Sequence, residues 1–338
     1  MTMFADVAAF HGALAALPEA DEAAIAAARA RQASLTKPPG SLGRLEDVAC
    51  FIAGWQGNPR PAIARARAAV FAGNHGIAAL GVSAFPATVT AQMVANFRAG
   101  GAAINALAGA NGLELAIVPF DLDAPTADFT AGPAMSEAEC LAALNAGAAT
   151  VEDGLDLFVP GEMGIANSTA AAALAARSFG GSGVDWVGPG TGVDAHGLAR
   201  KAEVVDAGLA AHARAPRDAF ETLRRVGGRE TAAIAGAVLA ARLKRIPVLL
   251  DGFICCASIA PLVAERAEMI AHCLAGHCSA EPGHARLLGQ FGLEPLLSLG
   301  MRLGEGSGAA VAVGIVRAAL AAHNSMATFA EAGVSGAA

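Results

Sequence analysis

The sequence predicts an α/β protein built around a mostly parallel β-sheet. Seven short apolar runs recur between residues 68 and 299, and helical patterns lie between most of them. Several runs end in glycine-rich turns, as 68–72 does in Gly73-Asn74-His75-Gly76. Continuous apolar runs are typical of strands buried on both faces of a parallel sheet, and right-handed crossovers bring their carboxyl ends to one edge. We therefore expect the functional site at that edge.

Composition and charge limit the classes of protein to which the chain can belong. Hydrophobic residues make up 54% of the 338 residues and charged residues only 16%, which predicts a large buried core. The net charge of −7 argues against nucleic acid, which requires a basic surface. The apolar runs are broken well before the roughly 20 residues of a membrane-spanning helix, and the acidic N-terminus lacks the basic start of a secretory signal. Six cysteines are too few for a disulfide framework, so we expect a cytoplasmic protein. From its charge and its short apolar runs, we expect no nucleic-acid partner and no membrane partner.

The first 60 residues predict helices only. Residues 5–33 are rich in alanine, and Asp21 is the expected N-cap of a helix within them. Lys37-Pro38-Pro39-Gly40 then breaks the chain, because proline does not continue a helix. Ser41 is expected to cap the next helix. Its apolar face is formed by Leu42, Leu45, Val48 and Ile52.

The strands follow from there. They are expected at 68–72, 113–119, 155–159, 184–187, 246–250, 269–274 and 296–299. The last run leads through a glycine-rich turn into a long apolar helix at 309–322.

That last turn contains an isolated carboxylate. Glu305 stands between glycines in Gly304-Glu305-Gly306-Ser307-Gly308, where the absence of Cβ atoms lets a ligand approach closely. The segment alone favours a solvated turn carboxylate and a ligand-facing one about equally. A similar pattern occurs at Gly161-Glu162, which is followed by Asn167-Ser168 and another helix of small residues. In a chain rich in alanine and glycine, coincidence explains this similarity at least as well as an internal repeat does.

Two turns are candidates for binding an anion. Asn167-Ser168-Thr169 predicts either plain helix capping or a phosphate site at free helical N–H groups. The turn 188–192, with Gly188, Gly190, Thr191 and Gly192, is a candidate second anion nest. It lacks the GxGxxG spacing, and the chain has no GxxxxGK, so neither a dinucleotide nor a Walker-type ATP site is indicated. Lys201 is either a surface lysine or a counter-charge for such a phosphate.

Other polar groups leave alternatives open. His75, after the first strand, either reaches the site or satisfies a loop carbonyl. The histidines and cysteines between His272 and His284 lack the usual zinc-ligand spacing, which favours buried thiols and loop histidines over a metal site. Ser83 and Gln92 are placed to orient a flat apolar ligand, whereas Met93 is of a type more often found in the core.

Several motifs together resemble one family of enzymes. They are TKPPGSLGRLE (36–46), GNHGI (73–77), GVSAFP (81–86), QMVANF (92–97), GEMGIANSTAAAAL (161–174), GPGTG (188–192), LLDGF (249–253), SAEPGH (279–284) and LGEGSGAA (303–310). In this combination and order, the chain resembles the nicotinate-nucleotide–dimethylbenzimidazole phosphoribosyltransferases. The match runs nearly end to end. Two departures are Ala166-Asn167-Ser168, where the family pattern is Gly-Asn-Thr, and Phe85, where it has tyrosine.

The resemblance implies a fold and a reaction. The implied fold is a Rossmann-like three-layer α/β domain at 61–308, with a small helical domain formed by 1–60 and 309–338, in a homodimer. The implied reaction transfers the 5-phosphoribosyl group of nicotinate mononucleotide to 5,6-dimethylbenzimidazole with inversion. The products are α-ribazole 5′-phosphate and nicotinate, in assembly of the lower ligand of cobalamin.

The resemblance also implies roles for particular residues. Glu305 is the general base, and Glu162 is a possible second carboxylate. The benzimidazole pocket is formed by Ser83, Phe85, Gln92, Met93 and Leu303. The nucleotide and its phosphate are bound by Gly164, Asn167, Ser168, Gly188, Gly190, Thr191, Gly192 and Lys201.

The chemistry of this transfer agrees with an isolated carboxylate. When one benzimidazole nitrogen attacks C1′ of the ribose, a base must take the proton from the other nitrogen. Nicotinate leaves from a ring that is already cationic, so we expect no cofactor and no metal. Two alternatives are a non-catalytic nucleotide- or benzimidazole-binding protein and a zinc hydrolase using 272–284. The sequence leaves open which base is preferred and which surface forms the dimer.

Overall fold

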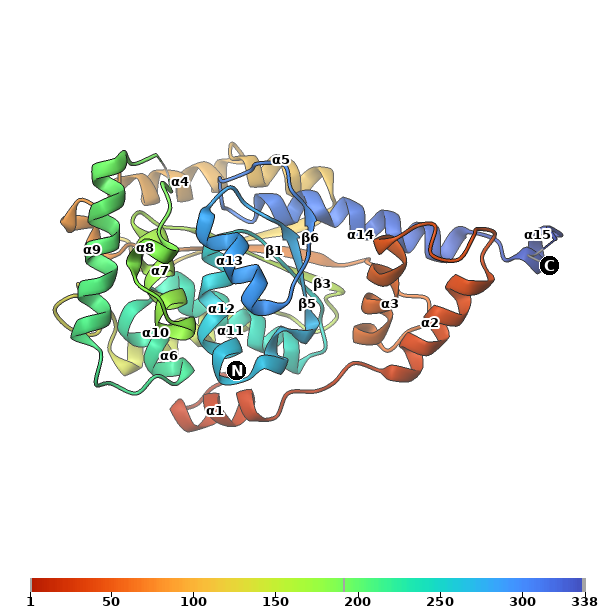
Figure 1. Cartoon of the computed structure of the whole chain (residues 1–338), viewed down its shortest axis with the longest axis horizontal. Helices are drawn as coiled ribbons and strands as arrows, with labels where there is room; N and C mark the ends of the chain where they lie inside the picture. Colours follow the sequence, from red (N-terminus) through yellow and green to blue (C-terminus); the bar gives the residue numbers. More distant parts are fainter. Residues whose placement is uncertain (1, 191, 336–338) are drawn as a thin grey trace.

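The computed structural model describes residues 2–190 and 192–335, in which helices cover both faces of a central sheet (Figure 1). Among these residues, six parallel strands form the sheet in the order β2-β1-β3-β4-β5-β6. The strands are β1 (Ala66–Ala72), β2 (Leu113–Pro119), β3 (Leu157–Met163), β4 (Val248–Leu250), β5 (Cys273–His277) and β6 (Pro295–Leu297). The chain adds β2 on one side of β1 and β3 on the other. Parallel sheets bind ligands beyond the carboxyl ends of the strands beside such a reversal.

Helices form one layer on each face of the sheet. One layer contains α6 (Glu137–Ala149), α7 (Asn167–Phe179), α10 (Ala219–Val226), α11 (Arg229–Leu243) and α12 (Phe253–Glu265). The opposite layer contains α3 (Arg44–Gln56), α4 (Thr88–Ala99), α5 (Ala103–Ala110) and α14 (Ser307–Ser325). The remaining helices are α1 (Val7–Ala15), α2 (Glu22–Ser34), α8 (Gly183–Trp186), α9 (Ala195–Ala211), α13 (Pro282–Phe291) and α15 (Phe329–Ala332), with the 3-10 turns η1 (Gly76–Leu80) and η2 (Ala267–His272).

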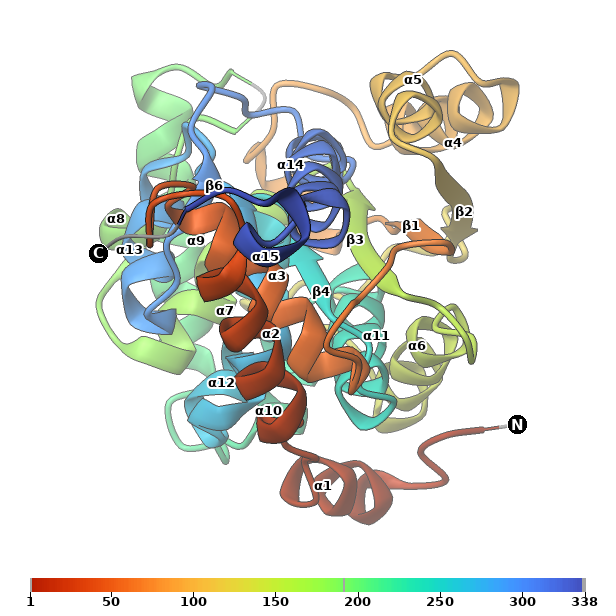
Figure 2. The same ribbon diagram turned by 90° about the vertical axis from the view of Figure 1, so that its right-hand side faces the viewer.

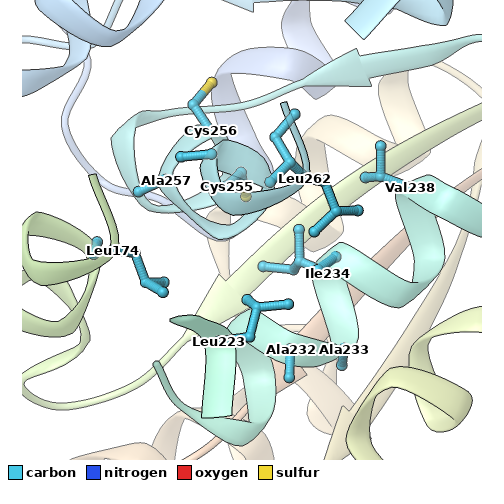
Figure 3. Close-up of a cluster of buried hydrophobic side chains, with 14 of the residues drawn as sticks. Leu174, Leu223, Ala232, Ala233, Ile234, Val238, Cys255, Cys256, Ala257 and Leu262 are labelled. Atoms are coloured by element: carbon cyan, nitrogen blue, oxygen red, sulfur yellow. The ribbon is translucent and has the colours of Figure 1, made fainter. Parts of the chain in front are cut away.

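The inner strands are mostly buried, as their apolar runs predict, whereas the edge strands β2 and β6 are only partly buried. Along β1, Ala69 and Phe71 pack into the core on the α11 side, whereas Ala68 and Val70 pack on the α14 side. Figure 3 shows the first core, where Leu174, Leu223, Ile234 and Leu262 of four helices meet. This arrangement confirms the predicted α/β class.

Two predicted strands are wrong or displaced. Residues 184–187 lie at helix α8, because Ser182 and Asp185 cap each other: the Ser182 N–H donates to Asp185 Oδ2 at 2.8 Å. Residues 269–272 belong to η2, and the strand predicted at 269–274 lies later, at Cys273–His277.

Two helix starts and one strand end also refine the predictions. Asp21 caps α2 as predicted, accepting a hydrogen bond from Ala24 N at 2.9 Å. Ser41 does not cap α3, which begins after Gly43 at a left-handed backbone angle of φ 55°. The third strand continues beyond Val159 to Met163, so Glu162 belongs to β3 itself.

Helices from both chain ends lie side by side beyond the amino ends of the strands (Figures 1 and 2). Arg31 of α2 donates to the His323 carbonyl of α14 at 2.8 Å, which ties the two ends together. In contrast, α1 packs on the large body, where Phe10 contacts Phe220 at 5.9 Å between ring centroids. The domain division at 60 and 308 stays a prediction. In the part of the chain that the structure describes, no helix is both long and apolar enough to cross a membrane.

Candidate active site

A cavity opens at the carboxyl edge of the sheet, where the sequence places the site. Its volume is about 100 Å³. Its walls come from the ends of β3 and β5, the start of α7, and the segment before α14. The lining includes predicted site residues and their neighbours: Glu162, Met163, Gly164, Asn167, Ser168, Gly190 and Leu303, with Gly252, His277, Ser279, Glu281 and Arg302.

Glu305 is buried and follows Gly304 of the cavity lining, but it does not itself line the cavity. Its exposure is only 4%, so it is not a solvated turn carboxylate. The turn has left-handed φ angles at three successive residues, 85° at Gly304, 64° at Glu305 and 84° at Gly306. Glu305 Oε2 accepts a hydrogen bond from the Ile104 N–H at the start of α5, at 3.4 Å.

The surroundings of Glu305 make it a stronger base than an exposed carboxylate. Burial raises the pKa of its carboxyl above the ordinary value, the hydrogen bond from Ile104 opposes this, and the charge of Asp251 raises the pKa further. Arg302, the nearest basic residue in sequence, points elsewhere: its Nη1 donates to the Gly190 carbonyl at 3.3 Å. Its guanidinium is therefore not the hydrogen-bond partner of Glu305.

Glu162 is a second buried carboxyl, 6% exposed, at the end of β3. The amide of Asn167 donates a short hydrogen bond to its Oε2. Burial raises the pKa of Glu162 to about 8, helped by the charge of Asp251 and opposed by that hydrogen bond. Glu162 is therefore mostly protonated at neutral pH before substrate binds. Gly304 lies against this carboxyl so closely that a Cβ at position 304 would collide with it.

The start of α7 does not have the expected capping arrangement. The N-cap is Ala166, at a left-handed φ of 75°, and no side chain caps the helix. Asn167 contacts Glu162, and Ser168 Oγ accepts from Lys201 Nζ at 3.0 Å. The capping interpretation is wrong, because these side chains point to the cavity and leave first-turn N–H groups without a side-chain acceptor.

Lys201 is a buried cation near this helix start. Only 1% exposed, it is not a surface lysine, and its Nζ donates to the Gly188 carbonyl at 2.6 Å as well as to Ser168. Burial lowers the pKa of Lys201 to about 8, an effect that the nearby Glu281 carboxylate opposes. Gly190 N donates to Glu281 Oε1 at 3.0 Å, and Gly190 and Gly192 have left-handed φ angles. Thr191 lies outside the described residues.

The five residues assigned to the benzimidazole pocket are not gathered in one hollow. Leu303 lines the main cavity, and Ser83 lines a smaller neighbouring hollow with Ser168 and Lys201. Phe85 is 49% exposed and lines a separate hollow with His75. On α4, Gln92 is exposed and Met93 packs partly into the core. Their role in binding the base stays a prediction.

The histidines have mainly structural partners. His75 is buried and contacts Glu230 at 2.5 Å, so it does not bind a loop carbonyl through that nitrogen. His272 is buried with both ring nitrogens near backbone carbonyls, and burial lowers its pKa to about 3. His284 contacts Ser279 and Cys256. Within the described ranges no group of three or more His, Cys, Asp or Glu side chains is arranged to hold a metal ion.

Sequence reasoning missed Asp251 and His277 as members of the site. Asp251 directly follows β4 and is 1% exposed; His277 ends β5 and is 3% exposed. Their one visible signal is position, because each closes a short apolar run at the edge that carries Glu162. Which strands are neighbours is decided by the fold, and the sequence alone does not order them.

Comparison with known proteins shows the family to which the chain belongs. A family model described as "Phosphoribosyltransferase" matches residues 17–334. A nicotinate-nucleotide–dimethylbenzimidazole phosphoribosyltransferase of Novosphingobium aromaticivorans is 70% identical over 334 residues, 99% of each chain. One of Cereibacter sphaeroides is 57% identical over 98% of each chain.

Solved structures agree as well. The crystal structure of CobT from Thermus thermophilus superposes with a TM-score of 0.87 at 40% identity, over 93% of this chain and 100% of that one. A match of this extent includes the sheet and the helical layers on both of its faces. This chain therefore belongs to the nicotinate-nucleotide–dimethylbenzimidazole phosphoribosyltransferase family and is a pentosyltransferase.

Proposed function

We propose that this enzyme transfers the 5-phosphoribosyl group of nicotinate mononucleotide to 5,6-dimethylbenzimidazole, with Glu305 as the general base. The products are α-ribazole 5′-phosphate and nicotinate, used in assembling the lower ligand of cobalamin. The observation that carries the proposal is a buried carboxylate next in sequence to Gly304 of the cavity lining, with a raised pKa and, among the described residues, no cationic side chain bonded to it. A base facing an apolar ring keeps its basicity only without such a partner.

The reaction moves one proton and one glycosidic bond. The lone pair of one benzimidazole nitrogen attacks C1′ of the ribose from the face opposite nicotinate. The bond from C1′ to the pyridinium nitrogen breaks, and its electron pair neutralises that ring. The proton on the second benzimidazole nitrogen passes to Glu305, which prevents a cationic product ring. General-base catalysis of this kind contributes roughly 10²–10⁴-fold.

Glu162 is proposed to stabilise positive charge on the sugar. The ribose passes through an oxocarbenium-like state, which an adjacent carboxylate stabilises electrostatically. With a pKa raised to about 8 in the free enzyme, Glu162 must lose its proton first. The cationic ring of the nucleotide favours that loss, because a nearby positive charge stabilises the ionised carboxylate.

The phosphate is proposed to bind between Lys201 and the start of α7. Lys201 Nζ and Ser168 Oγ, 3.0 Å apart, supply a cation and a hydroxyl. First-turn N–H groups of α7 add donors and the positive end of a helix dipole. Holding the phosphate there orients C1′ for attack.

The quaternary state and compartment are further parts of the proposal. Phe85, Leu299 and Leu303 are apolar yet 49%, 61% and 55% exposed, and Leu303 lines the cavity. A second copy of the chain covering this surface, as in a homodimer, would remove that apolar area from water. All six cysteines are unpaired, which supports a reducing, cytoplasmic setting.

The test is a direct assay of the purified chain with both substrates. We expect nicotinate release that requires dimethylbenzimidazole and yields one equivalent of the α-linked nucleotide. A folded protein that binds both compounds without releasing nicotinate would instead be a non-catalytic binding protein. Release that needs only water would indicate a hydrolase.

A further inference from the structure

Asp251 is a buried carboxylate that the proposed mechanism does not use. It directly follows β4, and its two oxygens accept hydrogen bonds from the start of α14. Oδ2 accepts from Gly306 N at 3.2 Å, and Oδ1 accepts from Ala309 N at 2.9 Å. Gly306 is the residue directly after Glu305. A carboxylate from one strand therefore holds the turn that carries the base.

Among the residues that the structure describes, no other side chain caps the helix end of that turn. The N-cap of α14 is Gly306, which has no side chain to accept from the free N–H groups of the first turn. Glu305 has a left-handed backbone, which an L-residue adopts only when the surrounding structure holds it there. Asp251 supplies the missing cap from outside the helix and constrains the backbone next to Glu305.

His277 lies close to Asp251 on its other side. His277 Nε2 lies 3.3 Å from Asp251 Oδ1, and both residues end neighbouring strands, because Leu250 pairs with Ala275. Gly308 lies against the His277 ring, so that a Cβ at position 308 would collide with it. The sheet thus fixes Asp251 and His277, and these two fix the first turn of α14.

We propose that Asp251 is a positioning residue for the transfer, which holds the 304–306 turn so that the Glu305 carboxylate faces the base. The proposal rests on the role proposed for Glu305. Asp251 does not touch substrate in this role. It acts through the Gly306 and Ala309 amides and through its negative charge.

The charge of Asp251 affects the pH dependence of kcat/KM, which a residue that only caps the helix would not change. The titratable groups that face it are the carboxyls of Glu162 and Glu305, the rings of His277 and His284, and the thiols of Cys255 and Cys256. Asp251 raises the pKa of both Glu162 and Glu305. Removing its charge therefore lowers both pKa values and moves the acid limb of kcat/KM to lower pH. A cap that only stabilises the helix changes the melting temperature without moving that limb.

Two variants separate geometry from charge. Asp251→Asn keeps the size but loses the charge and one acceptor, and Asp251→Glu keeps the charge but displaces the turn by one methylene. We expect kcat to fall roughly 10- to 100-fold in both, with the KM of each substrate little changed. The acid limb moves to lower pH in Asp251→Asn and stays in Asp251→Glu. The matched control is Asp218→Asn, at a carboxylate that caps α10 through Glu221 N at 2.9 Å and does not line the cavity.

The same experiment distinguishes this proposal from the one on which it rests. Glu305→Gln is assayed beside the Asp251 variants, with circular dichroism to verify folding. Suppose that Glu305→Gln is inactive, and that both Asp251 variants fold and have a kcat within about twofold of the parent. This result would overturn the role of Asp251 alone. A lower kcat in Asp251→Asn with no change in the acid limb of kcat/KM would also overturn the role of Asp251. An active Glu305→Gln would instead overturn the proposed base. If Asp251→Asn does not fold, the kcat of Asp251→Glu decides.

Discussion

At the scale of single residues, burial determines the charge of the groups that carry the chemistry. Glu162 and Lys201 are of opposite type, yet each has its pKa moved to about 8, because burial disfavours whichever form is charged. The free enzyme therefore has a mostly protonated acid and a cation that is easily neutralised. Substrate charges shift both groups toward the ionised forms that the reaction needs.

Lys201 predicts how nucleotide binding depends on pH. Because its pKa is lowered to about 8, Lys201 loses its charge as the pH rises through that value, and the KM for nicotinate mononucleotide should rise. In Lys201→Met we expect KM to increase roughly tenfold or more at neutral pH, and its rise above about pH 8 to disappear. Lys244→Met, at a lysine paired with Asp153 at the opposite edge of the sheet, is the control. An unchanged KM in Lys201→Met would contradict the proposed role of Lys201 in binding the phosphate.

Glu162 predicts the acid side of the same profile. Because the raised pKa of Glu162 is about 8, kcat/KM should increase with pH up to that region as the carboxyl ionises. Glu162→Gln should lower kcat/KM by roughly 10²-fold and flatten this limb, because an amide does not ionise. Steady-state rates on both sides of that pKa measure this. If Glu162→Gln keeps the kcat/KM and the acid limb of the parent enzyme, Glu162 has no catalytic role and only contacts Asn167.

At the scale of elements, close helix packing depends on particular glycines. In α11, a Cβ at Gly236 would collide with the backbone at Leu144 of α6, whereas the space around Gly289 of α13 is open. Gly236→Ala should therefore lower the free energy of unfolding by about 1–3 kcal/mol or more. Gly289→Ala should raise it by up to about 1 kcal/mol, since alanine loses less backbone entropy in a helix. Urea denaturation measures both, and equal effects would contradict the packing argument.

The elements also indicate what could be predicted from the sequence. The apolar run of β1 predicted that strand, because β1 lies inside the sheet and is almost fully buried. The run of β2 predicted a strand that lies at the edge of the sheet and is only partly buried. Residues 184–187 were misassigned because four residues are too few to distinguish a buried strand from a helical turn. The Ser182-x-x-Asp185 spacing of a capping box was the available signal. At α7, residue types typical of caps were present, but Glu162 and Lys201 engage their side chains.

At the scale of the whole molecule, strand order decides which residues meet. Glu162 and Glu305 were assigned roles through the family resemblance, because the motifs GEMG and LGEGSG contain them. Asp251 and His277 were not, because their roles depend on β3, β4, β5 and α14 meeting at one edge. The burial of Glu305 likewise depends on Ile104 of a distant helix, which no local pattern shows.

Three exposed apolar side chains predict the state of the molecule in solution. Phe85, Leu299 and Leu303 are poorly suited to contact with water, so we expect a dimer in which a second copy covers them. Sedimentation should give twice the chain mass of 33.5 kDa. A monomer at working concentrations, with full activity, would contradict this expectation.

The role of Glu305 is tested most directly by single-turnover measurement of the Glu305→Gln variant with both substrates bound. The amide keeps the size of the side chain but does not accept the ring proton. We predict unchanged dissociation constants for nicotinate mononucleotide and dimethylbenzimidazole, with the rate of nicotinate release reduced by roughly 10²–10⁴-fold. A release rate within about threefold of the parent enzyme would contradict the assignment of Glu305 as the base.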